Sequence, residues 1–239
     1  MLASRKIQVS AIVFVILCVI GLIVLIVAGN DTKKLATSEL KSFTFFDIGA
    51  NTTFSKGLRR VLSDRLGADA IQYRNIIDLE MNFKGFLKRY FPQLDELNQQ
   101  LNYPPGERVD HNTVKLMYRH FKNKEAPFHY VELMFAKHSN KPLFIKILLK
   151  KDSSAIIDTI EKKYGQPLTI QWNDGDGRTE YWRNNRDYLI TSIAPNRQDR
   201  LEYQIMIFYV DNLEELVNRE EKERRRREEQ RRQAGETAF

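Results

Sequence analysis

Few residues in this chain have the type and spacing that metal or nucleophilic chemistry requires. The chain holds one cysteine, Cys18, which excludes a disulfide framework and a cysteine-based zinc site. None of the histidines lies in an HExxH arrangement or in a helical i,i+4 pair: His111, His120, His129 and His138. Neither a GxSxG nucleophile elbow nor a GxxxxGKS/T phosphate loop occurs. The sequence therefore predicts no catalytic residue and no cofactor.

Two carboxylates, Asp174 and Asp176, stand two residues apart in the glycine-rich segment NDGDG at residues 173–177. Such spacing is typical of the start of a calcium loop, but Arg178 stands where the third oxygen ligand belongs. Asp174 and Asp176 are therefore weak metal candidates. The favoured interpretation is a hairpin turn whose glycines take positive φ.

An aromatic and basic patch is expected just after this turn. Tyr181 and Trp182 are neighbours in a predicted strand, so they point to opposite faces of the sheet and one ring is expected to look outward. Arg183 and Arg186 follow closely. We therefore take Trp182, Arg183 and Arg186 as candidates for binding a peptide or glycan partner, against the alternative that most such rings pack in the core.

The C-terminal segment 213–239 predicts a charged helix. Residues 219–232 hold eight basic and five acidic side chains and no apolar one, a net charge of +3 within the chain's +7. Asp211 and Glu214 form a capping-box-like start. Four ion pairs have the favourable i,i+4 order: Glu220–Arg224, Glu221–Arg225, Glu223–Arg227 and Glu228–Arg232. The segment is either a solvated extension or a partner-docking helix, with Arg224, Arg225, Arg226 and Arg227 as the binding candidates.

Residues 11–28 form an uncharged apolar run that is long enough to cross a bilayer as one helix. A cleaved signal peptide has a shorter apolar core, and a lipoprotein needs a small residue where Leu17 precedes Cys18. We therefore expect an uncleaved transmembrane signal anchor, with a cleaved signal as the alternative. Residues 1–10 are expected in the cytoplasm, 29–42 as a stalk, and the body in the periplasm of a bacterial inner-membrane protein.

The body, 43–212, predicts an α+β fold. Hydrophobic residues at 42% and charged residues at 29% are ordinary globular values. Helices are expected near 53–66, 83–101 with a break at Pro92, and 153–164, each marked by a 3.6-residue apolar period. The predicted strands are 70–79, 113–121, 128–136, 143–149, 168–172, 179–183, 188–193 and 201–210. Short loops between them predict antiparallel sheets with helices on one face, as one domain or as two helix–meander units, 43–140 and 141–212.

Residues 152–216 resemble small bacterial envelope adaptor domains of the outer-membrane assembly small-lipoprotein type. The resemblance covers about a quarter of the chain: KYGQP at Lys163–Pro167, a tryptophan-bearing strand, Tyr181-Trp182, and YVDNLEEL at Tyr209–Leu216. It implies a domain that binds other envelope proteins. The lipid-bearing cysteine of that family has no counterpart here.

These observations favour a membrane-anchored, non-enzymatic envelope protein whose periplasmic domain binds another envelope component. Two alternatives stay open. One is an enzyme that acts on envelope polymers through carboxylates such as Asp78, Glu80 or Glu132. The other is a cytoplasmic nucleic-acid binder that uses the arginine run. Nucleic acid is not the expected partner, since the interleaved glutamates cancel over half of the positive charge.

Overall fold

The computed structural model describes residues 42–150, 154–172, 177–195 and 201–238. The chain divides after Lys41, and every described residue belongs to the part that begins at Ser42. The predicted anchor 11–28 and the metal candidates Asp174 and Asp176 lie outside the described residues. Across those described ranges, no helix combines the length and the apolar character needed to cross a membrane.

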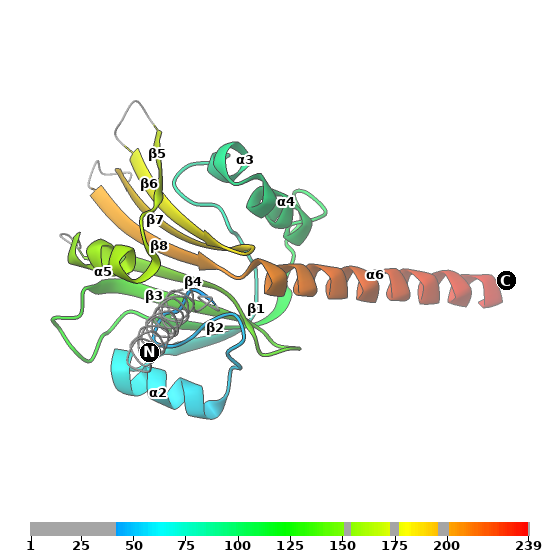
Figure 1. The fold of residues 1–239 in the computed structure, drawn as a ribbon. Coiled ribbons are helices and arrows are strands. Elements are labelled where there is room, and N and C mark those ends of the chain that lie inside the picture. The colour runs from blue at the N-terminus through cyan, green and yellow to red at the C-terminus, as the bar shows by residue number, and fades with distance from the viewer. Residues whose placement is uncertain (1–41, 151–153, 173–176, 196–200, 239) are drawn as a thin grey trace, which may run out of the picture. The chain divides into compact units, whose positions relative to one another are not determined.

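One antiparallel sheet of eight strands forms the centre of the body, in the order β1-β2-β3-β4-β8-β7-β6-β5 (Figure 1). Its strands are β1 Ala70–Asn75, β2 His111–Tyr118, β3 Phe128–Ala136, β4 Pro142–Leu149, β5 Leu168–Trp172, β6 Gly177–Asn184, β7 Asp187–Pro195 and β8 Leu201–Phe208. Strands β1–β4 form one meander and β5–β8 another. The last strand of each meander pairs with the last strand of the other, since Phe144 on β4 lies opposite Phe208 on β8. The predicted α+β class with antiparallel strands is confirmed.

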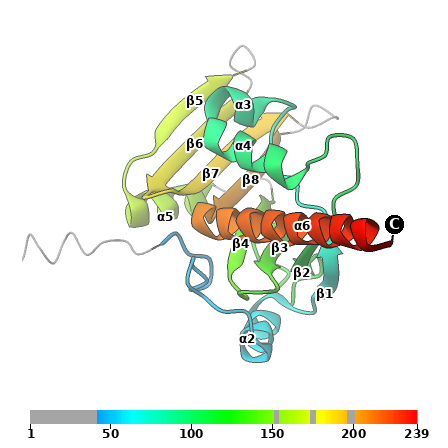
Figure 2. The ribbon, with the colours of Figure 1, turned by 90° about the vertical axis from the view of Figure 1, so that its right-hand side faces the viewer.

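Among the described residues, five helices pack on this sheet: α2 Lys56–Leu66, α3 Phe86–Tyr90, α4 Pro92–Leu101, α5 Ser154–Tyr164 and α6 Val210–Ala238. Residues of α2 and α5 contact one face of the sheet, and residues of α3, α4 and the start of α6 contact the other (Figures 1 and 2). The expectation that helices cover one face is therefore wrong. Central strands carry apolar side chains at consecutive positions, such as Leu133, Met134 and Phe135 in β3, so both faces need a cover.

The helix boundaries follow local chemistry. Ser55 caps α2 by accepting a hydrogen bond from the Leu58 backbone N–H at 3.1 Å. Gly67 ends α2 at φ 105°, where an added Cβ would lie 2.7 Å from the carbonyl oxygen of His120. Pro92 stands at the first position of α4 and separates α3 from α4, as the sequence predicts.

The start of the described chain is fastened beside the base of α6. The hydroxyl of Tyr209, which is fully buried, lies 3.1 Å from the carbonyl oxygen of Phe43 and 3.0 Å from that of Ile48. The Asn212 amide donates hydrogen bonds to the carbonyl oxygens of Ala50 at 2.9 Å and Pro142 at 2.8 Å. The contacts to Phe43, Ile48 and Ala50 join residues more than 150 positions apart, so the first residues of the body and the first turn of α6 form one corner.

Candidate interaction surface around helix α6

Helix α6 begins at a buried, hydrogen-bonded site on the sheet. Val210, Leu213 and Leu216 are buried in the core between the sheet and α4. The Val210 backbone N–H donates to Asp187 Oδ1 at 3.0 Å, so a carboxylate from β7 caps the helix. Burial raises the pKa of Asp187 from its ordinary 3.8 to about 6. The capping box predicted for Asp211 and Glu214 is wrong, because the helix already begins at Val210 and the first backbone N–H of the helix donates to this distant carboxylate.

Arg186, in the turn between β6 and β7, holds the first turn of α6. Its Nη1 atom donates to Asp211 Oδ1 at 3.1 Å and to Glu214 Oε2 at 2.6 Å, and Nη2 pairs with the other oxygen of Glu214. The Gln93 side-chain amide is oriented with its oxygen toward Arg186. In this orientation the Gln93 oxygen accepts a hydrogen bond from Arg186 Nη2 at 2.7 Å. These carboxylates raise the pKa of Arg186 further. The predicted partner-binding Arg186 is thus engaged inside the protein.

The second and third turns of α6 make further contacts with the body. Glu215 lies 3.3 Å from His138 Nε2 and 3.4 Å from Lys141 Nζ, both in the β3–β4 connection. Glu220 lies 2.7 Å from Nδ1 of His111, the first residue of β2, whose side chain is 1% exposed. Because a carboxylate only accepts, His111 Nδ1 carries the proton and donates it. Together these contacts fix α6 against the body through its third turn.

One more contact marks the end of the docked part of α6. The guanidinium of Arg224 lies over the Tyr103 ring, 5.3 Å from its centroid. Residues 224–234 are exposed, and Figure 1 shows the helix projecting far beyond the sheet. The structure confirms a long charged C-terminal helix.

The charges of the projecting part are only partly neutralised. Glu221–Arg225 and Glu223–Arg227, the latter at 3.7 Å, form as predicted. The predicted Glu220–Arg224 pair is wrong, since Glu220 binds His111 and Arg224 lies over Tyr103, and Arg232 pairs with Glu229 at 2.8 Å. Within the described part of the chain, four cations of this segment form no ion pair: Lys222, Arg226, Arg231 and Arg224, which lies over the Tyr103 ring.

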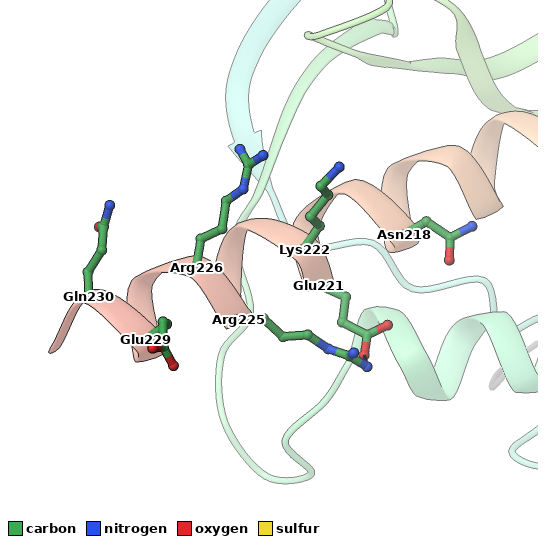
Figure 3. A pocket seen from close by; sticks show the side chains of 7 residues that line it. All are labelled: Asn218, Glu221, Lys222, Arg225, Arg226, Glu229 and Gln230. Atoms are coloured by element: carbon green, nitrogen blue, oxygen red, sulfur yellow. Dashed lines mark hydrogen bonds and ion pairs between the residues drawn. The ribbon is translucent and has the colours of Figure 1, made fainter. Parts of the chain in front are cut away.

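The two long sides of α6 differ. Figure 3 shows Lys222, Arg226 and Gln230 on one side of the helix, and Glu221, Arg225 and Glu229 on another. We call Lys222, Arg226 and Gln230 the outer face, because the groove described next is lined by other residues of α6.

A groove of about 1300 Å³ lies between α6, α4 and the ends of β1 and β2. Two exposed tyrosines line it, Tyr73 at 55% and Tyr103 at 56%. The Lys137 ammonium lies 5.5 Å from the Tyr73 ring centroid, and Arg227 and Arg231 reach the groove from α6. Exposed aromatic rings beside arginine are the composition that protein interfaces favour.

The predicted patch at Trp182 does not form. Trp182 is 5% exposed, and its indole N–H donates to the Gly165 carbonyl oxygen at 2.6 Å. Tyr181 packs against the core on the opposite face, with its ring 5.1 Å from that of Phe91. The expectation that one ring looks outward is wrong because both faces are covered. Arg183 is exposed, and its guanidinium lies 5.5 Å from the Tyr188 ring centroid.

The carboxylates considered for an enzyme make local contacts. Asp78 accepts a hydrogen bond from the Glu80 backbone N–H at 3.0 Å, and Glu80 accepts one from Gly85 at 3.3 Å. Burial raises the pKa of Glu80. Glu132, on β3, accepts a hydrogen bond from the Tyr130 hydroxyl. Over the described ranges, no three histidine, cysteine, aspartate or glutamate side chains gather in a way that could hold a metal ion.

The groove beside α6 is not predicted by any motif of the sequence. His111, Tyr103 and Tyr73 lie on three separate segments, and the tertiary arrangement of α6, α4, β1 and β2 brings them to one groove. The one local signal is Tyr103, which stands directly before the turn residues Pro104, Pro105 and Gly106. No protein-family model, no curated protein and no solved structure matches this chain.

Proposed function

We propose that this protein is a membrane-anchored, non-enzymatic envelope protein that binds another envelope protein through the groove beside α6. In this proposal residues 11–28 cross a bacterial inner membrane, residues 1–10 stay in the cytoplasm, and the body lies in the periplasm. The resemblance of residues 152–216 to envelope adaptor domains supports the same class of function.

One observation carries the proposal: α6 is fixed along its first half and leaves a groove with exposed aromatic rings. Contacts at Asp187, Arg186 and His111 set its direction before any partner arrives. A surface that is already ordered loses little conformational entropy on binding, so contacts at Tyr73 and Tyr103 contribute more fully to affinity. Protein ligands that present an apolar segment flanked by carboxylates match the tyrosines and the adjacent Arg227 and Arg231.

A pull-down from detergent-solubilised membranes tests the proposal. The variant Tyr73→Ser with Tyr103→Ser removes both rings from the groove, and we expect it to recover at least about tenfold less of the partner. The matched control, Val61→Ser with Leu168→Ser, removes two exposed apolar side chains at 48% and 61% exposure outside the groove. Recovery of the protein alone, or equal loss in both variants, would contradict the proposal.

The orientation has its own test. A reporter enzyme that is active only outside the cytoplasm, fused after Phe239, should be active. Activity of a reporter that works only in the cytoplasm would place the body on the other side of the membrane and favour nucleic acid as a partner of the arginine run.

A further inference from the structure

The chain enters the described body at the corner where α6 begins. Tyr209 and Asn212 hold the carbonyl groups of Phe43, Ile48 and Ala50 beside the first turn of α6. Residues 29–41 can span at most about 45 Å when fully extended. Helix α6 has 29 residues and is therefore about 43 Å long. A bilayer that holds residues 11–28 thus lies within reach of every turn of α6.

The outer face of α6 suits a negatively charged surface. Lys222 and Arg226 are exposed, form no ion pair among the described residues and lie together with Gln230 (Figure 3). On the groove side, by contrast, Glu220 and Glu223 are present and already paired. Residues 218–233 include no apolar side chain, so this stretch can bind a surface through charge but cannot insert into hydrocarbon.

We propose that the outer face of α6 docks on the anionic phospholipid head groups of the bilayer that anchors the chain. This proposal rests on the membrane anchor of the proposed function. Each lysine or arginine near an anionic leaflet raises the ratio of docked to free α6 about fivefold. The anchor keeps α6 at high effective concentration beside the lipid, so a few cations are enough. Docking of the outer face leaves the groove on the other side of α6 open to a partner.

The test uses the full chain reconstituted in vesicles of pure lipid. A fluorophore is placed at Gln230→Cys in a Cys18→Ser background, and energy transfer to a labelled lipid reports how close α6 is to the bilayer. We expect transfer in vesicles that contain phosphatidylglycerol at low salt. Transfer should be lost at 0.5 M salt, a condition that screens charges beyond about 4 Å, and it should be absent in phosphatidylcholine alone.

A pair of variants tests which face docks. Lys222→Gln with Arg226→Gln removes two charges from the outer face and should lower the ratio of docked to free α6 about 30-fold. Arg225→Gln with Arg227→Gln removes the same charge from residues that are already paired with Glu221 and Glu223. This control should lower the ratio less than about fivefold.

The outcomes separate the two proposals. A chain that does not float with the vesicles shows that the anchor of the proposed function is wrong. A chain that floats while α6 stays undocked in anionic vesicles overturns only the lipid proposal and leaves an acidic protein surface as the occupant. Equal effects of the two double variants, or docking that persists in phosphatidylcholine or in high salt, also overturn it.

Discussion

The cap that Asp187 provides for α6 predicts an unusual dependence of stability on pH. Its carboxylate accepts the Val210 N–H while half-buried, and burial raises its pKa from 3.8 to about 6. The folded state therefore binds more protons than the unfolded state between about pH 4 and pH 6. The contribution of Asp187 to the free energy of unfolding is therefore fully present below about pH 4 and is lost as the pH rises through 6. At neutral pH the ionised, half-buried Asp187 thus lowers the free energy of unfolding.

Replacing Asp187 by asparagine should remove this cost and keep the cap. The amide oxygen of Asn can still accept the Val210 N–H, but it carries no charge to desolvate. A pKa shift of this size corresponds to about 3 kcal/mol, and screening by water at this partly exposed site reduces it to about 1.5 kcal/mol. Asp187→Asn should therefore raise the free energy of unfolding by about 1.5 kcal/mol at pH 8 and by almost nothing at pH 4.

Urea unfolding of the full chain in mild detergent measures this difference. Trp172 and Trp182 are both buried in the body, so their fluorescence reports its unfolding. Asp187→Ala is the control, because it removes the charge and the cap together and should cost about 1 kcal/mol at pH 4. A stabilisation by Asp187→Asn that is equal at pH 4 and pH 8, or a destabilisation at pH 8, would refute the argument from burial.

Three further substitutions test other contacts. Tyr209→Phe should lower the free energy of unfolding by about 2 kcal/mol, because it removes the buried hydroxyl whose one proton the carbonyl oxygens of Phe43 and Ile48 share. Faster proteolysis near residue 48 should accompany the loss, and unchanged cleavage would contradict it. Glu220→Ala should leave the buried Nδ1 of His111 without its acceptor and lower the free energy of unfolding by about 2 kcal/mol. Hydrogen exchange in residues 217–224 should become faster. An unchanged exchange rate there would show that α6 is held without Glu220. Gly177→Ala should cost about 2 kcal/mol by urea unfolding, because the added methyl group meets the Trp172 ring; wild-type stability would show that the ring can move aside.

The local elements of the fold could be predicted from the sequence. Strands 128–136 and 168–172 have the predicted bounds, since turn residues flank each apolar run. The first strand was predicted to reach residue 79 but ends at Asn75, and Ile77 and Leu79 instead fill the core from the following loop. Apolar content alone does not distinguish a strand residue from a buried loop residue.

The long-range arrangement could not be predicted in the same way. Alternation correctly placed Tyr181 and Trp182 on opposite faces, but covering both faces depends on which strands become central. Arg186 was expected at a partner surface, yet it pairs with Glu214, 28 residues away in the sequence. His111 and Glu220 are 109 residues apart, and neither has a local pattern that indicates the other. Whether the body is one domain or two stays a prediction.

The pairing of β4 with β8 places the joint between the two meanders at the middle of the sheet. A polypeptide cut between β4 and α5 would expose a long row of unsatisfied backbone donors and acceptors on each fragment. Each fragment would then be a template for the other, and mixing them should restore the native sheet by complementation. The same property makes either fragment alone prone to aggregate. Strands β4 and β8 can therefore pair only after the chain has been synthesised as far as β8.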